Sequence, residues 1–112
     1  MEMVTPLLSV HLVRSRRYAV VRPTGELDLA GHAALCLAIS RAEQASPSVV
    51  VDLSTLDFMD SSSLRLLSAA HERALARARG FHLIAGRPSV QAVFRLTGTE
   101  TRFRWISPEQ LA

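Results

Sequence analysis

A run of three β-branched residues, Val49 to Val51, constrains the fold of this chain more than any other feature. The run continues to Leu53 with one polar interruption, a pattern typical of a strand buried on both faces of a sheet. A short connection then leads to the polar segment 60–63, and a helical pattern of apolar residues begins at Leu64. The sequence therefore predicts a strand, a loop and a helix, as in α/β proteins.

The other elements follow from the same periodicities. Alternation of apolar and polar residues predicts a hairpin of strands at 7–13 and 18–22, and Pro23 to Gly25 should end or bend the second strand. The order β-β-α-β-α-β-α-β predicts an α/β fold. It should consist of a mixed sheet of about five strands together with three to four helices. The expected helices are residues 30–45, 64–79 and 89–96, and the later strands are residues 81–85 and 103–106.

Residue types at the helix faces and ends sharpen this prediction. The first helix should bury Leu35, Ile39 and Ala42. Gly80 should close the second helix, Ser89 should cap the third, and Gly98 should end it. The expected inner face of the second helix consists of Leu64, Leu67, His71, Leu75 and Ala78.

At 112 residues the chain is expected to form one domain, with a core at about 7–106 and a loose tail at 107–112. No apolar run approaches the roughly 18 residues of a membrane span, and the N-terminal order of charges does not fit a secretory signal. The single cysteine, Cys36, lies in a helical pattern rich in Ala and Leu, where a packing role is expected. These features together predict a cytoplasmic protein.

All 13 basic residues are arginines, and they are scattered along the sequence. Aromatic residues make up only 5% of the chain, which argues against stacking platforms for bases. Direct nucleic-acid binding is therefore not expected. A net charge of +3 is compatible with an acidic protein partner.

The segment from Asp60 to Ser63 places three hydroxyls where a helix begins. Free backbone N–H groups and the positive end of the helix dipole can accommodate a phosphate there. Serine at such a position is also a common helix cap, and Asp60 is expected to provide the N-cap. From pattern alone, Ser61 is thus either a capping hydroxyl or a modifiable one.

Three segments of the chain resemble a known family. Asp60-Ser61-Ser62 after the valine strand, Gly25-Glu26-Leu27-Asp28, and the stretch 88–98 are similar to the STAS domain, and most of all to the small anti-sigma factor antagonists. That family usually reads D-S-S-G-L, so Ser63 stands where the family has glycine. The resemblance covers about residues 7–106 and implies a STAS-like fold.

The resemblance also implies a function. An unphosphorylated antagonist would bind an anti-sigma factor with an ATP-binding serine kinase domain, freeing a sigma factor. Phosphorylation at Ser61, with Ser62 as a second acceptor, would switch it off, and a phosphatase would reset it. The residues expected to face the partner are Asp28, Asp60, Ser61, Ser62 and Ser63. Asp28 has an equally strong alternative role as the cap of the helix beginning near Ala30.

Other functions stay open. A STAS domain can be a non-switching subunit of a stressosome-like scaffold or a lipid-transport complex, and fold alone does not separate these uses. A small-molecule or nucleotide-binding module is a third possibility, although the chain has no phosphate-binding loop motif and no lysine. Ser61 with His71 or His82 and with Asp52 or Asp60 has the residue types of a nucleophilic triad, but catalysis is not expected because the chain has no G-x-S-x-G elbow. No cofactor and no metal are predicted.

Overall fold

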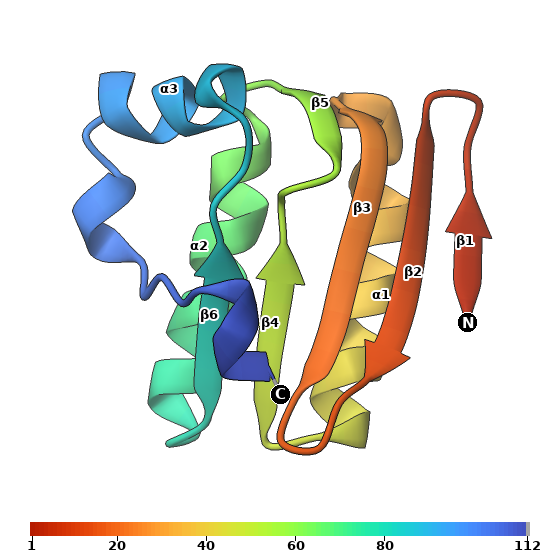
Figure 1. Cartoon of the computed structure of the whole chain (residues 1–112), viewed down its shortest axis with the longest axis vertical. Helices are drawn as coiled ribbons and strands as arrows, with labels where there is room; N and C mark the ends of the chain where they lie inside the picture. The colour runs from red at the N-terminus through yellow and green to blue at the C-terminus, as the bar shows by residue number, and fades with distance from the viewer. Residues whose placement is uncertain (112) are drawn as a thin grey trace.

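The computed structural model describes residues 1–111 as a six-stranded mixed sheet with two long helices packed on one face (Figure 1). The strands are β1 (Glu2–Val4), β2 (Leu8–Arg14), β3 (Ala19–Leu27), β4 (Ser48–Asp52), β5 (Leu56–Met59) and β6 (Gly80–Ile84). The α-helices are α1 (His32–Ala45), α2 (Ser63–Ala76) and α3 (Pro88–Leu96). Short 3-10 helices lie at Leu29–Gly31, Glu100–Arg102 and Pro108–Leu111.

The strands lie in the order β1-β2-β3-β4-β6, and β5 pairs with β3 beyond the end of β4. The two N-terminal pairings are antiparallel, whereas β3, β4, β5 and β6 run parallel. The predicted α/β class with a mixed sheet is confirmed. Because parallel strands share a direction, their carboxyl ends meet at one end of the sheet, where β5 leads into α2.

The valine strand is buried on both faces, as its composition predicts. Val49 and Val51 belong to the main core between the sheet and the helices. Val50 points to the other face, where it packs with Val20 and Ile84. The C-terminal segment covers this second cluster through Ile106 and Leu111. The tail expected to be loose thus includes a short 3-10 helix, and Ala112 lies outside the described residues.

The strand prediction was wrong in four places. Neither β1 nor β5 was expected, and the strand expected at 103–106 is reduced to one bridge between Leu83 and Trp105. The second strand does not end at Arg22 but continues to Leu27. Gly25 makes this continuation possible, because its φ of +105° accompanies a register shift against β5.

The inner face of α2 was predicted correctly only in its first half. Leu64 and Leu67 are buried, but the stripe then follows Ala70 and Ala74, and Leu75 is 53% exposed. Helical geometry allows either a three- or a four-residue step, and the small alanines face the core here. The helix ends at Ala76, and the exposed Ala78, not Gly80, takes the left-handed turn, with a φ of +54°.

The third helix begins earlier than predicted. Pro88 occupies its first turn and Arg87 the N-cap position, so Ser89 is not the cap. Proline fits the first helical position because its missing N–H would be unpaired there. Gly98, with a φ of +71°, follows the end of the helix as predicted.

Candidate functional site

Residues 60–63, here called the serine turn, join β5 to α2 at the carboxyl end of the parallel strands. Met59 at the end of β5 pairs with Leu27 at the end of β3. The backbone N–H of Asp60 then donates to the Leu27 carbonyl oxygen at 3.1 Å. The pairing of β3 with β5 therefore determines where the serine turn lies.

Asp60 organises the serine turn through one carboxylate oxygen. Its Oδ1 accepts hydrogen bonds from the Ser62 hydroxyl at 2.7 Å, the Ser63 hydroxyl at 3.1 Å and the Ser63 backbone N–H at 3.3 Å. The last bond satisfies the first amide of α2, so Asp60 does cap the helix, but the residue at the N-cap position is Ser62 and not Asp60 as predicted. Burial alone would raise the pKa of Asp60, but these bonds and nearby His32 outweigh it and lower the pKa. Asp60 is therefore a carboxylate at neutral pH.

Ser61 and Ser62 are both exposed, but of these two only the Ser61 side chain is free of hydrogen bonds among the described residues. Within residues 1–111, its hydroxyl takes part in no hydrogen bond, whereas its backbone carbonyl accepts from Leu64 N–H at 3.2 Å. The hydroxyl therefore does not cap the helix. Because it is exposed and takes no part in the bonds that hold the turn, it is accessible to a partner or an enzyme.

Ser63 was expected to face a partner, but its side chain lies inside the protein. It is fully buried, and its hydroxyl lies 3.0 Å from His32 Nε2 and 3.4 Å from the Leu27 carbonyl oxygen. The helix direction turns the side chain at this position inward against β3 and α1. Ser63 therefore positions the turn and cannot contact a partner through its side chain.

His32, the first residue of α1, is a member of the site that the sequence reading missed. Its Nε2 lies 3.0 Å from Ser63 Oγ and 3.4 Å from Ser62 Oγ, so it links α1 to the start of α2. The only sequence signal was its position, four residues after Asp28 at the start of a predicted helix. Nothing in the local pattern specifies a contact with residues about 30 positions later.

Asp28 lies at the end of β3, beside the serine turn in the register of the sheet. Its Oδ1 accepts from the Ala30 backbone N–H at 3.0 Å and caps the 3-10 helix before α1. The alternative of a capping role is thereby confirmed. The side chain is only half-buried, so a role in partner contact stays a prediction.

A hollow of about 440 Å³ opens beside the serine turn, lined by Leu29, His32, Ser61, Ser62 and Arg65. Leu29 is 74% exposed. A second hollow of about 270 Å³ extends along the groove between α1 and α2. Cys36 lines it and is exposed, so the predicted packing role is wrong. A free hydroxyl beside exposed apolar and cationic side chains is suited to contact with another protein.

Two of the residues weighed for a nucleophilic triad, Asp52 and His71, are engaged elsewhere. Asp52 pairs with Arg22 Nε at 3.0 Å. The ring of His71 packs against Phe81 and Phe103. In the described chain, no group of three or more His, Cys, Asp or Glu side chains is placed to hold a metal ion. Across residues 1–111, no helix is both long and apolar enough to span a membrane.

We predict that His32 and Ser63 stabilise the serine turn as a pair. His32→Ala and Ser63→Ala should each lower the free energy of unfolding by about 1 kcal/mol, because each removes the hydrogen bond that links α1 to the start of α2. The double variant should lose clearly less than the sum of the two. Urea unfolding of the four proteins measures this coupling, and strictly additive losses would contradict it.

Comparison with known proteins agrees with this geometry. A family model described as "Mlab, STAS domain" matches residues 10–107. The chain belongs to the STAS domain family. The resemblance inferred from the sequence is thereby confirmed. A search of curated protein sequences gave no match.

Solved STAS structures share the fold closely. An anti-sigma factor antagonist from Mycobacterium paratuberculosis is similar with a TM-score of 0.81 and 29% identity, over 95% of this chain and 91% of that one. The anti-sigma factor antagonist SpoIIAA in its unphosphorylated form is similar with a TM-score of 0.69 and 26% identity, over 90% of each chain. The Bacillus cell fate determinant SpoIIAA in its phosphorylated form is similar with a TM-score of 0.67 and 26% identity, over 90% of this chain and 94% of that one.

Proposed function

We propose that this STAS protein is an anti-sigma factor antagonist controlled by phosphorylation of Ser61. In the unphosphorylated state it binds an anti-sigma factor that carries a serine kinase domain, which frees a sigma factor. Phosphorylation by that kinase releases the antagonist, and a phosphatase restores it. The protein acts in the cytoplasm as a substrate of these enzymes and catalyses nothing itself.

The observation that carries the proposal is the free, exposed hydroxyl of Ser61 at the start of α2. Because no internal bond depends on this hydroxyl, a phosphate can be added without breaking the turn. A phosphate carries about −1.5 to −2 charges at neutral pH, and the positive end of a helix favours such a charge. The fold can therefore persist while a partner surface shaped for a neutral hydroxyl is rejected.

The solved structures support the same reading. One similar protein has been determined in both an unphosphorylated and a phosphorylated form. Ser63, which replaces the glycine usual in the family, is buried and adds no bulk to the surface around Ser61. The departure from the family pattern therefore does not block approach to the hydroxyl.

A reconstitution experiment tests the proposal. Proteins captured from native lysate with the tagged chain are identified by mass spectrometry, and a captured kinase-domain protein is purified. It is then incubated with ATP and with wild type, Ser61→Ala or Ser62→Ala. We expect one phosphate on wild type and on Ser62→Ala, and none on Ser61→Ala.

The alternatives give different results. Phosphate on Ser61→Ala but not on Ser62→Ala would move the switch to Ser62. A stable complex with a partner that never phosphorylates the chain would replace the switch with a non-switching STAS subunit. Capture of no kinase-domain protein, combined with binding of a nucleotide to the pure chain, would favour the small-molecule module.

A further inference from the structure

Arginines gather at the end of the sheet opposite the serine turn. The β2–β3 connection, the end of α1 and the end of α2 meet there, at the amino ends of β4 and β6 (Figure 1). Residues 14–18, 41–48 and 72–80 contribute seven arginines and two glutamates, so this end carries a net charge of +5. The whole chain carries +3, so all other residues together carry −2. The arginine end consists of Arg14, Arg16, Arg17, Arg41, Arg73, Arg77 and Arg79.

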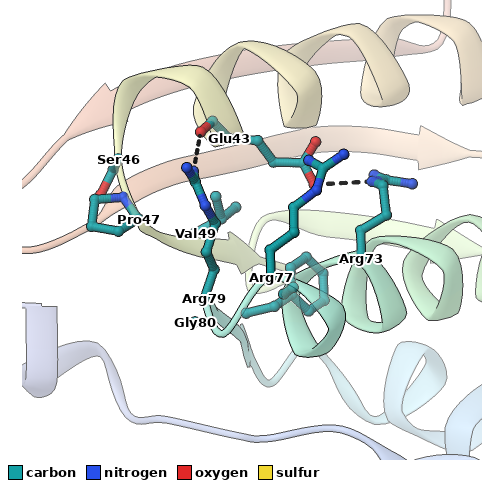
Figure 2. A pocket seen from close by; sticks show the side chains of 10 residues that line it. Glu43, Ser46, Pro47, Val49, Arg73, Arg77, Arg79 and Gly80 are labelled. Carbon is teal, nitrogen blue, oxygen red and sulfur yellow. Dashed lines mark hydrogen bonds and ion pairs between the residues drawn. The ribbon is translucent and has the colours of Figure 1, made fainter.

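Hydrogen bonds show that three of these arginines stabilise the fold. Arg14 Nη2 donates to the Ala45 carbonyl oxygen at 3.2 Å, and Arg79 Nη1 donates to that of Glu43 at 2.9 Å. Arg73 Nε pairs with the Glu43 carboxylate at 3.1 Å, as Figure 2 shows. Cations at the carboxyl end of α1 are favourable there, so structural duties explain these side chains.

Three other arginines make no such structural interaction. Arg16, Arg17 and Arg77 are exposed, and their side chains form no hydrogen bond or ion pair with any residue in 1–111. Like charges held together without partners repel one another, so folding gains nothing from this arrangement. Figure 2 shows Arg77 beside Arg73 and Arg79, in a site where the chain's own carboxylate is already bound.

We propose that the arginine end is a second docking surface, which binds an acidic segment of a partner protein. Guanidinium groups recognise carboxylates through paired hydrogen bonds, and the Arg73–Glu43 contact shows the site holding a carboxylate. Single-stranded nucleic acid fits less well, because Tyr18 is half-buried and Phe81 is buried, so neither offers a face for stacking.

This surface is separate from the serine turn. The parallel strands begin at the arginine end and finish at the other, so the two sites lie at opposite ends of the sheet. A partner held at the arginine end leaves Ser61 accessible. Binding there should therefore be unaffected by Ser61→Asp, which separates this proposal from the phosphorylation switch.

The test uses a fluorescent polyglutamate peptide and measures anisotropy on the intact protein at physiological salt. Wild type should bind it, and the triple variant Arg16→Glu, Arg17→Glu, Arg77→Glu should bind at least about tenfold more weakly. The matched control reverses three exposed arginines elsewhere and should retain binding within about threefold. The control substitutions are Arg95→Glu, Arg102→Glu and Arg104→Glu.

The outcomes that overturn the proposal are defined by two further probes. Tighter binding of a DNA or RNA oligonucleotide than of polyglutamate would reassign the surface to nucleic acid. Tighter binding to vesicles containing phosphatidylserine would reassign it to a membrane. Absence of polyglutamate binding at physiological salt, or equal losses in the two triple variants, would refute it, provided that thermal unfolding shows both variants to be folded.

Discussion

Ser61→Asp should weaken binding to the kinase-domain anti-sigma factor by about 100-fold, whereas Ser61→Ala should bind like wild type. The reason is local, because the Ser61 hydroxyl is exposed and free of internal bonds. An aspartate places an unpaired charge against a partner surface that fits a neutral group, and removing that charge from water on binding costs free energy. Isothermal titration calorimetry with the purified partner measures both affinities.

The chain offers a matched control for this result. Ser89 is an exposed serine in the first turn of α3, so Ser89→Asp adds the same charge at another helix start. It should leave affinity unchanged within about threefold. Equal losses for the two variants would mean that net charge alone weakens binding. Unchanged affinity for Ser61→Asp would remove Ser61 from the interface.

Gly25→Ala should lower the free energy of unfolding by at least about 3 kcal/mol. Gly25 has a φ of +105°, and an added Cβ would meet the Leu7 carbonyl oxygen. That oxygen cannot move freely, because it accepts the Glu26 backbone N–H at 2.9 Å. Strain and steric conflict therefore act together. Urea unfolding followed by circular dichroism gives the loss.

Gly98→Ala provides the comparison for this variant. Gly98 also has a positive φ, of +71°, but an added Cβ would meet no atom within 4 Å. It should cost only about 1 kcal/mol, from backbone strain alone. A similar loss in the two variants would mean that the contact with Leu7 is unimportant. The Gly25→Ala substitution should also disturb the site, because Gly25 lies at the register shift between β3 and β5. The pairing of these two strands positions Asp60.

The strongest sequence patterns predicted the centre of the fold. The valine strand and the apolar positions of α1 were recognised because both have long, consistent periodicities. The short strands β1 and β5 were missed because three or four residues give no readable alternation. Their pairing depends on neighbours that are distant in sequence, and no local signal specifies such neighbours.

The end of β3 was predicted wrongly because of Pro23. Proline usually breaks a strand because it cannot donate a hydrogen bond to the sheet. Here it lies where β4 has left β3 and β5 has not yet joined, since pairing resumes only at Gly25. The hydroxyl of Thr55 donates to the Pro23 carbonyl oxygen at 2.9 Å in this gap. A local rule about proline cannot anticipate a gap created by two other strands.

The candidate site was predictable in its chain position and not in its contacts. The order of residues 60–63 after a strand and before a helix was sufficient to locate the serine turn. The burial of Ser63 and its contact with His32 join segments 31 residues apart. Only packing of α1 against α2 brings them together, and a single sequence carries no measure of that packing.

The unequal distribution of charge has a consequence for how the molecule meets a partner. With arginines at one end of the strands and net negative charge over the remaining residues, the molecule has an electric dipole. In the field of a charged partner, a dipole experiences a torque that orients the protein before the surfaces touch. A phosphate on Ser61 adds negative charge at the far end and enlarges this dipole. Modification of one hydroxyl therefore changes the orientation in which the protein diffuses into contact, as well as the fit once contact is made.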